Sequence, residues 1–525
     1  MRRTHFFVVA FVVVAVVVSM SAIWPSTLWA MVVLGPLLVC GFYDAFQSTH
    51  AILRNYPIIG HGRYMLESVR PEFHQYFVEP NTGGKPFSRE ERSAVYQRAK
   101  DVRDTVPFGT QRDVYATGYE YISHSLTCTH PTEPPRIKIG GPHCTRPYDA
   151  SLLNISAMSY GSLSDAAVLA LNGGAKDGGF AHNTGEGGVS PYHLDPGGDL
   201  IWQIGTGYFG CRGSDGSFDS NRFADTVARD EIKMVEIKLS QGAKPGHGGI
   251  LPATKVTPEI AFIRGIPVGE TCLSSPSHTA FSTPIGLLEF VARLRELSGG
   301  RPVGFKLCVG RPEQFLSICL AMRQTGIIPD FIAVDGGEGG TGAAPIEFSN
   351  HVGMPLTDGL VAVHNLLVGL ELRDNIRLIA SGKVTTGFKM ARLMALGAES
   401  CYSARAMMFA LGCIQARRCN ANDCPTGVAT QDRNLIGGLV VSDKRKRVCR
   451  FHIATLHSLM ELVAAAGLNS PLELRPHHIH RRVEDDEVRT FEEIYEWLEP
   501  GQLLSSDGLS PKYTKMLERA RADRF

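Results

Sequence analysis

The sequence predicts an α/β protein whose main domain is a (β/α)8 TIM barrel, preceded by a two-helix membrane hairpin and followed by a C-terminal helical extension. From about residue 150 onward, short apolar runs alternate with longer stretches of helical periodicity, which is typical of a parallel sheet. About eight such runs over roughly 270 residues match the size of this barrel. An open doubly wound sheet is the alternative, but no GxGxxG opens a helix after an early strand.

The expected barrel strands are the apolar runs at residues 152–157, 179–182, 234–239, 271–274, 303–307, 331–334, 378–381 and 399–402. Helices between and around them carry their own start signals. Thr283 can cap an amphipathic helix over residues 285–297. Ser88, with Glu91 three residues later, predicts a capping box at the start of a helix over residues 88–104. Further helices are expected at residues 312–324, 360–370, 388–396 and 453–466.

The N-terminus is far more apolar than the rest of the chain. Residues 6–23 form an uninterrupted run of apolar and small residues, and a second run extends over residues 28–43. A run of about eighteen such residues can cross a bilayer as a helix. Arginines flank both outer ends of the pair, at Arg2, Arg3, Arg54 and Arg63. A hairpin with both ends in the cytoplasm satisfies the positive-inside tendency, so we expect the barrel domain to face the cytoplasm from the inner (cytoplasmic) membrane.

Two other interpretations of the apolar pair remain open. It can be a cleaved signal peptide, with residues 19–22 as a weak processing site, or a pair of soluble core helices. A second apolar run straight after the first favours anchoring. The expected domains are a transmembrane hairpin over residues 1–45, a juxtamembrane scaffold over 46–148, the barrel with its metal segment over 149–440 and a helical extension over 441–525.

Composition excludes some classes of function. The 53 Lys and Arg residues balance the 52 Asp and Glu residues, which gives no support to a nucleic-acid partner. Twelve cysteines are too few for a disulfide scaffold in 525 residues, and they fit a reducing compartment with one dedicated metal site. Many of the 55 glycines cluster in tight loops, where backbone can approach a ligand closely.

Three cysteines stand close together in LGCIQARRCNANDCPTGVATQ: Cys413, Cys419 and Cys424. Pro425 directly follows the last of them. Three thiolates so close in sequence can hold one iron–sulfur cluster. The spacing alone leaves a second interpretation open, in which these are unrelated buried cysteines.

Glycine-rich and polar loops follow the expected strands, at the end where a TIM barrel places its ligands. In NTGEGG at residues 183–188, Glu186 stands between glycines and can act as a base or anchor an amino or imino group. A turn with an exposed glutamate is the alternative. Most side chains of the SAMSYGSLS segment at residues 156–164 are small, which lets the backbone approach a planar ring. A simple strand-to-helix turn is the alternative interpretation.

The most informative loop is EIKLSQGAKPGHGG at residues 236–249. It places Lys238, Gln241 and Lys244 in or beside a glycine-rich turn, where lysines can bind carboxylates or phosphate as point charges. Lysine side chains are usually exposed at the surface, but the other residues of this loop mostly have small side chains. Arg264 lies further along the chain and can complete an anion site.

The later loops continue the pattern. Lys306 lies within an apolar strand and needs a partner, for which an anionic flavin ring is suitable; a lysine that reaches solvent at the strand end is the alternative. The DGGEGGTG segment at residues 335–342 has five glycines in eight residues and favours close approach of backbone to a ligand. The usual phosphate position of this barrel follows the last two strands, at Gly382, Lys383, Ala404 and Arg405.

Taken in this order, these segments resemble the FMN domain of the glutamate synthases over about residues 150–432. The specific parts are IKLSQGAKPGHGG, DGGEGGTGA and LGCIQARRCNANDCPTGVATQ. The whole chain, with its apolar N-terminal pair, is similar to the short membrane-linked FMN-binding members of that family. The resemblance implies two cofactors, FMN and a 3Fe–4S cluster.

The same resemblance implies roles for individual residues. The cluster ligands would be Cys413, Cys419 and Cys424. The flavin would be surrounded by Ser156, Ala157, Met158, Ser159, Lys238, Gln241, Lys306, Asp335, Gly337, Gly339 and Gly340. Its phosphate would be held by Gly382, Lys383, Ala404 and Arg405. The substrate, 2-oxoglutarate or its imine, would meet Glu186, Lys244 and Arg264, with Glu186 managing a proton and the two cations fixing carboxylates.

The implied reaction is reduction of an imine, formed from 2-oxoglutarate and ammonia, to glutamate. We expect the electrons to come from a separate donor protein, with direct hydride transfer to the flavin as the alternative. No segment resembles the amidotransferase domain of a complete synthase, so the expected reaction does not include glutamine hydrolysis. Two departures make the substrate less certain than the cofactor: Ile250 stands where the synthases have glutamine, and His247 replaces an acidic residue. Another 2-oxo acid, an imine or a quinone as substrate, and a non-catalytic membrane electron relay, are the alternatives.

Overall fold

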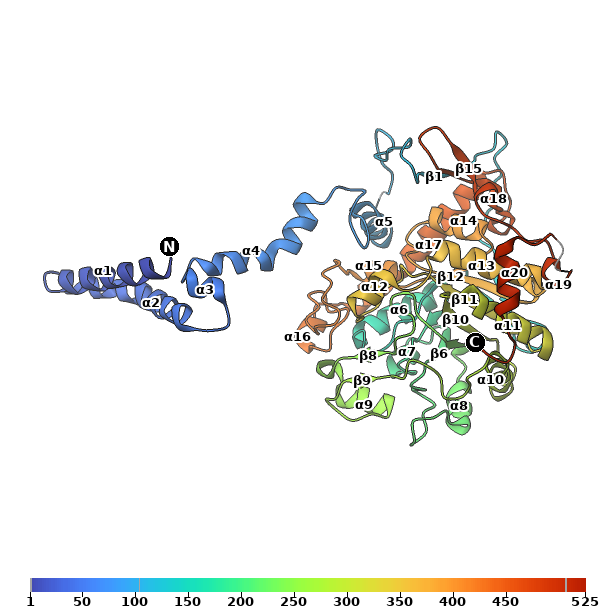
Figure 1. Cartoon of the computed structure of the whole chain (residues 1–525), viewed down its shortest axis with the longest axis horizontal. Coiled ribbons are helices and arrows are strands. Elements are labelled where there is room, and N and C mark those ends of the chain that lie inside the picture. The colour runs from blue at the N-terminus through green and yellow to red at the C-terminus, as the bar shows by residue number, and fades with distance from the viewer. Residues whose placement is uncertain (1, 103, 506–507) are drawn as a thin grey trace. The chain divides into compact units, whose positions relative to one another are not determined.

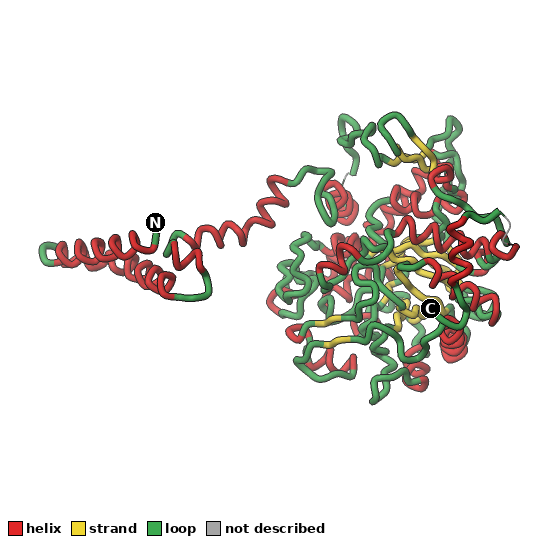
Figure 2. The backbone as a smooth tube through the Cα atoms, viewed as in Figure 1, coloured by secondary structure: helices red, strands yellow, loops and turns green. Residues whose placement is uncertain are grey.

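The computed structural model describes residues 2–102, 104–505 and 508–525. The chain divides into two compact units, Met1–Pro86 and Phe87–Phe525. In the described residues the first unit is helical, and every strand belongs to the second (Figure 2).

The first unit begins with two apolar helices, α1 (Arg3–Ser21) and α2 (Met31–Phe46), joined by a short helix η1 (Pro25–Ala30). They lie side by side and run in opposite directions (Figure 1). The ring of Phe6, near the start of α1, lies 5.3 Å from the ring of Phe42, near the end of α2. By length and composition, the spans Arg3–Ser21 and Pro25–Phe46 could each cross a membrane. The unit continues with α3 (Ala51–Asn55), α4 (Gly60–Phe73) and η2 (His74–Val78).

Within the described residues, eight parallel strands close a barrel in the second unit. Figure 2 shows these strands at the centre of the unit with helices around them. In chain order they are β4 (Leu153–Ile155), β5 (His182–Asn183), β6 (Leu200–Ile204), β7 (Ile232–Lys238), β10 (Val303–Cys308), β11 (Phe331–Asp335), β12 (Arg377–Ser381) and β13 (Ser400–Ser403). Because β13 pairs with β4, the sheet has no edge, and the predicted TIM barrel is confirmed.

One predicted barrel strand is wrong. Residues 271–274 contain β9 (Cys272–Leu273), which pairs antiparallel with β8 (Ile250–Leu251) inside the long segment between β7 and the next barrel helix. The eighth barrel strand is instead β6, which we did not predict. Its flanking helices α7 (Pro191–Leu194) and α8 (Ser220–Val227) have only 4 and 8 residues, so the strand–helix alternation is weak there. The other seven predicted strands each overlap a barrel strand.

The predicted helices are present, with shifted ends. The barrel helices are α6 (Asp165–Gly178), α10 (Pro284–Leu297), α11 (Pro312–Thr325), α13 (Leu356–Gly369), α14 (Gly387–Ala395) and α15 (Arg405–Leu411). Thr283 caps α10 as expected, since its hydroxyl accepts from the Gly286 N–H at 3.0 Å. Smaller elements are α9 (Pro258–Arg264), α12 (Ile346–His351), α16 (Arg433–Ile436), η3 (Ala253–Lys255) and η4 (Arg373–Asn375).

Upstream of the barrel, α5 (Arg89–Lys100) has the predicted capping box. The Ser88 hydroxyl accepts from the Glu91 N–H, and the Glu91 carboxylate accepts from the Ser88 N–H at 2.8 Å. The helix ends before the predicted limit because Asp101 adopts left-handed backbone, with φ of 58°. Arg103, within the predicted range, lies outside the described residues.

A hairpin of β2 (Ile137–Ile139) and β3 (Tyr148–Ala150) covers the end of the barrel where the strands begin. The Gly141 N–H donates to Asp330 Oδ1 at 2.7 Å, directly before β11. Arg377, at the start of β12, donates from Nε to the Lys138 carbonyl at 3.3 Å. The opposite end of the barrel, where the strands finish, is therefore left for the long loops.

The C-terminal segment packs on the outside of the barrel. The long helix α17 (Val441–Ala465) begins twelve residues before the predicted 453 and packs along α6. A small antiparallel sheet has the order β1 (Glu120–Ile122), β14 (Ile479–Arg482), β15 (Val488–Thr490). The remaining elements are η5 (Pro471–Glu473), η6 (Pro476–His478), α18 (Phe491–Ile494), α19 (Gln502–Ser505) and α20 (Pro511–Arg519).

Candidate functional site

A cluster of charged side chains lies where β5 and β7 end. Lys238, the last residue of β7, donates to Glu186 Oε1 at 2.7 Å and to Gln241 Oε1 at 3.1 Å. Burial alone would raise the pKa of Glu186, but the charges of Lys238, Lys244 and Arg264 outweigh it and hold this pKa at about 2. Glu186 is therefore an anion at neutral pH, and it interacts electrostatically with both of the other predicted catalytic residues, Lys244 and Arg264.

Lys244 and Arg264 reach this cluster from the long segment between β7 and α10. Burial lowers the pKa of Lys244 to about 8, although the Glu186 carboxylate opposes the shift. Lys244 Nζ donates to the Gly248 carbonyl at 3.2 Å. Arg264 ends α9, is 5% exposed, and donates from Nη2 to the Tyr160 carbonyl at 3.1 Å. Its Nε has no hydrogen-bond partner among the described residues, which leaves a buried donor for a ligand.

Two glycines leave space for the charged side chains of this cluster. A Cβ on Gly249 would lie 2.8 Å from Glu186 Oε1, and one on Gly187 would lie 2.8 Å from Arg264 Nη2. Either methyl group would push a charged group out of the cluster. The NTGEGG and KPGHGG sequences therefore serve the packing of the charged side chains themselves.

A second ion pair lies deeper in the barrel. Lys306 Nζ on β10 is 3.2 Å from Asp335 Oδ2 at the end of β11, and both side chains are buried. Burial works against the charge of Lys306, but Asp335 and Glu236 raise its pKa above the usual value, so the ammonium is retained. The structure thus supplies the partner that a lysine in an apolar strand requires.

Glu236 belongs to this buried network and was not among the predicted site residues. Its Oε1 accepts from Asn183 Nδ2 at 2.9 Å and from Gln203 Nε2 at 2.6 Å. Burial raises its pKa, although Lys306 and the two amides oppose the shift. The only signal in the sequence was a glutamate inside an otherwise apolar strand, two residues before Lys238.

The lysine loop and the glycine-rich loop are fastened to each other. Asp335 Oδ2 accepts from the Gly242 N–H at 3.0 Å, and Gln241 Nε2 donates to the Gly340 carbonyl at 2.8 Å. A Cβ on Gly242 would lie 1.7 Å from the Gly336 carbonyl oxygen, so only glycine fits there. Backbone bonds within the second loop join Gly337 to Met354 and Gly339 to Gly336.

The small-residue loop after β4 lies beside these groups. The Ser156 N–H donates to the Ser403 carbonyl at 3.1 Å, and the Met158 N–H donates to the Asn183 carbonyl at 3.1 Å. Ala157 is partly buried between them. The Ser159 hydroxyl donates to Ser162 Oγ at 3.1 Å. Ser156–Ser159 are therefore held between the ends of the neighbouring strands, as the barrel prediction requires.

The predicted phosphate residues follow the adjacent strands β12 and β13. Gly382 and Lys383 both have positive φ, of 154° and 48°, so the chain turns sharply after β12. Ala404 caps α15 at the end of β13. Arg405 turns its guanidinium toward the glycine-rich loop, where Nη2 donates to the Thr341 carbonyl, and Nη1 lies 3.9 Å from Cys419 Sγ.

The three cysteines of the segment are free thiols, and Cys419 and Cys424 lie close enough to Cys413 to act on it electrostatically. Burial raises the pKa of Cys413 to about 11, and the Cys419 and Cys424 thiols add to this shift. Burial also acts on Cys424, but hydrogen bonds from the Thr426 hydroxyl and nearby backbone N–H groups lower its pKa overall. Three such thiols next to an arginine fit an anionic iron–sulfur cluster.

Lys255 is a functional candidate that sequence reasoning missed. It is 2% exposed, and its Nζ donates to the Ala429 carbonyl at 2.7 Å and to the Ser162 carbonyl at 3.1 Å. Burial lowers its pKa to about 8, while Cys419 and Cys424 pull it upward. Lys255 therefore links the cysteine segment to the loop after β4. In the sequence, it looks like an ordinary surface lysine in LPATKVTP.

The helix α5 also contacts the cysteine segment. The Tyr96 hydroxyl donates to the Cys413 carbonyl at 2.6 Å. Phe87, directly before the helix, exchanges two hydrogen bonds with the Gln415 side-chain amide, each of 3.2 Å. Residues expected only as a scaffold thus position part of the candidate metal site.

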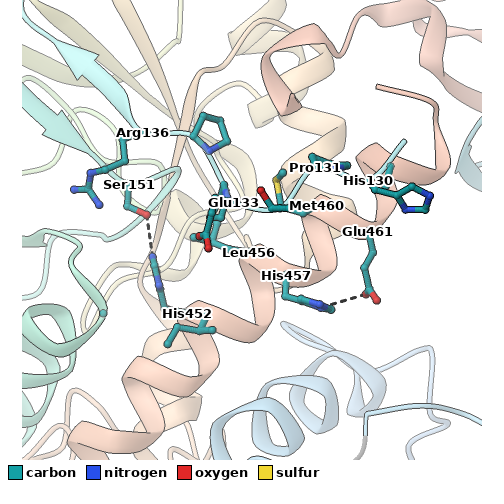
Figure 3. A pocket seen from close by; sticks show the side chains of 16 residues that line it. His130, Pro131, Glu133, Arg136, Ser151, His452, Leu456, His457, Met460 and Glu461 are labelled. Carbon is teal, nitrogen blue, oxygen red and sulfur yellow. Dashed lines mark hydrogen bonds and ion pairs between the residues drawn. The ribbon is translucent and has the colours of Figure 1, made fainter. Parts of the chain in front are cut away.

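A separate pocket of about 810 Å³ lies at the other end of the barrel, between α17 and residues 130–136 (Figure 3). Ser151, just before β4, approaches His452 Nε2 to 2.9 Å, and His457 lies 3.5 Å from Glu461. None of the described residues that line it belongs to the predicted site. The charged cluster at the strand ends is therefore distinct from this pocket.

Comparison with known proteins agrees with the geometry. Residues 141–469 match the family described as the conserved region in glutamate synthase. The glutamate synthase large subunit-like protein YerD of Bacillus subtilis is 38% identical over 492 residues, covering 86% of this chain and 93% of that protein. The archaeal glutamate synthase (NADPH) of Methanocaldococcus jannaschii is 36% identical over 328 residues, 61% of this chain and 60% of that protein. The archaeal-type enzyme of Thermotoga maritima is 33% identical over 325 residues, with the same coverage. This chain therefore belongs to the glutamate synthase family of oxidoreductases.

Proposed function

We propose that this protein reduces an imine formed from 2-oxoglutarate and ammonia to glutamate, using FMN and a 3Fe–4S cluster. The observation that carries the proposal is the convergence of Glu186, Lys238, Lys244 and Arg264 beside the buried Lys306–Asp335 pair. The family membership supports the reaction class.

FMN would lie among the strand-end loops. Lys306 retains a positive charge in a buried position, which suits a flavin ring that becomes anionic on reduction. The loop Ser156–Ser159, Gln241 and the glycines at 337, 339 and 340 would line the ring, and the turn at Gly382 and Lys383 with the start of α15 would hold the phosphate. Bound there, the flavin supplies hydride transfer, and the cluster on Cys413, Cys419 and Cys424 supplies single electrons.

The charge of the cluster suits a dicarboxylate. Lys238, Lys244 and Arg264 stand against the single carboxylate of Glu186, which leaves an excess of two positive charges. That excess would balance the two negative charges of 2-oxoglutarate. Lys244 and Arg264 are the better candidates for carboxylate binding, because Lys238 already bonds to Glu186 and Gln241. The unused Nε of Arg264 is a ready donor.

The pKa values suggest how a proton is handled. Glu186, with a pKa of about 2, is a weak base but a good anionic partner for an ammonium or iminium group. Lys244, with a pKa of about 8, can give up a proton close to neutral pH. We therefore propose that the Glu186 carboxylate holds the substrate nitrogen, and that Lys244, in place of Glu186, supplies the proton that this nitrogen takes up when the carbon receives the hydride.

We further propose that α1 and α2 anchor the protein in the cytoplasmic membrane, with the barrel in the cytoplasm. The antiparallel contact of Phe6 with Phe42 supports a hairpin whose two ends lie on the same side of the bilayer. Arg2 and Arg3 on one end and Arg54 and Arg63 beyond the other support the cytoplasmic side. Electrons would come from a separate donor protein.

One observation favours a different 2-oxo acid as a second candidate substrate. Ile250 directly follows Gly249, where a Cβ would lie 2.8 Å from Glu186 Oε1, and it opens β8 opposite Leu273. An apolar side chain next to the charged cluster suits a substrate whose distal end is less polar than a carboxylate.

The test is anaerobic reoxidation of the reduced protein. Purified full-length protein is reduced photochemically, and flavin absorbance is followed on adding 2-oxoglutarate with ammonia, ammonia alone, or other 2-oxo acids with ammonia. Rapid return of oxidised flavin with 2-oxoglutarate and ammonia, and formation of glutamate, is the expected result. Reoxidation only with a different 2-oxo acid would favour the second candidate, and none with any substrate would favour an electron relay.

A further inference from the structure

We propose that Cys40, Asp44 and His61 bind a divalent transition-metal ion, with Zn²⁺ as the best match. All three residues belong to the unit Met1–Pro86, so the site is independent of the barrel and of its cofactors. Their possible ligand atoms all lie within 4.8 Å of one another. The proposal goes beyond the proposed enzymatic function.

The secondary structure brings the three side chains together. Cys40 and Asp44 are one helical turn apart near the end of α2, so they share a face of that helix. His61 is the second residue of α4, and the turn before α4 brings it back to this face. The Ile58 N–H donates to Asp44 Oδ2 at 2.9 Å, which holds the turn against the helix. Ile58 has φ of 66°, so a β-branched residue accepts left-handed backbone to make this approach.

The distances between the three side chains are close to those between the ligands of one metal ion. Cys40 Sγ lies 3.6 Å from His61 Nε2 and 4.0 Å from Asp44 Oδ2, and His61 Nε2 lies 2.9 Å from Asp44 Oδ2. A tetrahedral zinc ion with Zn–S of about 2.3 Å and Zn–N or Zn–O of about 2.0–2.1 Å separates its ligand atoms by roughly 3.3–3.6 Å. The three atoms could therefore surround one ion after shifts of a few tenths of an ångström.

The donor set and the charges also suit zinc. A thiolate, a carboxylate and a neutral imidazole carry two negative charges, which a divalent cation balances. The Asp44 side chain is fully buried within an apolar unit, where a carboxylate needs strong compensation. The His61 side chain is 50% exposed, so an ion can enter and keep a water as its fourth ligand. A bound ion would tie the end of α2 to the start of α4.

A hydrogen-bonded Asp44–His61 pair without an ion is the competing explanation. It accounts for the 2.9 Å contact, and it leaves the Cys40 thiol only long, weak contacts with Asp44 Oδ2 and His61 Nε2. The two explanations differ in whether the protein retains zinc after it has been exposed to the metal and washed, and in whether substitution of Cys40 changes the amount of zinc retained.

The experiment uses full-length protein in detergent, first treated with a chelator and then given Zn²⁺ and washed. Zinc, iron and FMN per chain are measured for the parent, Cys40→Ser and His61→Ala. Matched controls are Cys128→Ser, an exposed cysteine in the second unit, and His74→Ala, an exposed histidine in the first. Unchanged iron and FMN show that the barrel of each variant has folded, and an unchanged helical circular dichroism signal shows that the helices of the first unit are retained.

One zinc per chain in the parent and both controls, lost in Cys40→Ser and His61→Ala, is the expected result. Zinc K-edge absorption should then show one sulfur and several nitrogen or oxygen neighbours. Zinc retained equally by Cys40→Ser and His61→Ala, or none retained by the parent, would overturn the proposal. A spectrum with three sulfur neighbours would also overturn it, because it would place the ion on the cysteines at 413, 419 and 424 instead.

Discussion

Arg405 Nη1 lies 3.9 Å from Cys419 Sγ, and Nη2 of the same guanidinium donates to the Thr341 carbonyl. The Arg405 side chain thus contacts both the cysteine segment and the glycine-rich loop that follows β11. A fixed positive charge therefore lies between the two proposed cofactor sites. This contact also explains why arginine, a planar cation with several donors, is useful at the start of α15.

Arg405→Met is expected to lower the reduction potential of the cluster. Removing a cation next to Cys419 destabilises the reduced, more negative cluster, and about 1 kcal/mol corresponds to a decrease of roughly 40 mV for one electron. The measurement is a redox titration followed by paramagnetic resonance. Arg405→Lys keeps the charge and should stay close to the parent; equal potentials in parent and Arg405→Met would contradict the assignment.

Cys419→Ser is expected to abolish the paramagnetic signal of the oxidised cluster while the barrel remains folded. The reason is the loss of one of three thiolates, for which a serine hydroxyl is a poor substitute. Low-temperature resonance spectra and circular dichroism measure the two properties. Cys449→Ser, a cysteine on α17 outside the segment, should keep the signal. An unchanged signal in Cys419→Ser would refute the ligand assignment.

Lys306→Met is expected to weaken FMN retention by about 10- to 100-fold, since a charged hydrogen bond contributes roughly 1.5–3 kcal/mol. The substitution also leaves Asp335 buried without its cation, so FMN content and thermal stability are measured on the same preparation to tell weaker flavin binding from a less stable fold. Dialysis of the flavin and a thermal melt are the measurements. Lys176→Met, an exposed lysine on α6, is the control. Equal FMN content in Lys306→Met and the parent would count against its role.

Affinity for the 2-oxo acid should fall as the pH rises through about 8, because Lys244 loses its charge there. The stability of the fold should change in the opposite direction. Burial lowers the pKa of Lys244 in the folded protein to about 8, below its pKa in the unfolded chain. Between these two pKa values the unfolded chain binds more protons than the folded protein, so the free energy of unfolding rises with pH. Titration of the flavin spectrum with 2-oxoglutarate measures the affinity. Lys244→Arg should keep it constant across this range, and a parent without pH dependence would exclude Lys244 from carboxylate binding.

The sequence was sufficient wherever local chemistry and tertiary structure agree. Ser88 and Glu91 encode the start of α5, and apolar runs followed by polar glycine-rich loops encode seven barrel strands with Glu186 and Lys238 at their ends. The strand at residues 271–274 could not be told from a barrel strand, because only pairing with Ile250–Leu251 distinguishes them. The bonds of Lys255 to Ala429 and Ser162 join residues far apart in the chain, so no local pattern marks this lysine as buried.

The central claim is that one chain holds a flavin and an iron–sulfur cluster beside the charged cluster at the strand ends. Its most direct test is quantitation of FMN, iron and acid-labile sulfide in full-length protein purified without oxygen. The account predicts one FMN per chain, with iron and sulfide in the ratio of a 3Fe–4S cluster. Protein that is folded but contains neither iron nor acid-labile sulfide would contradict it.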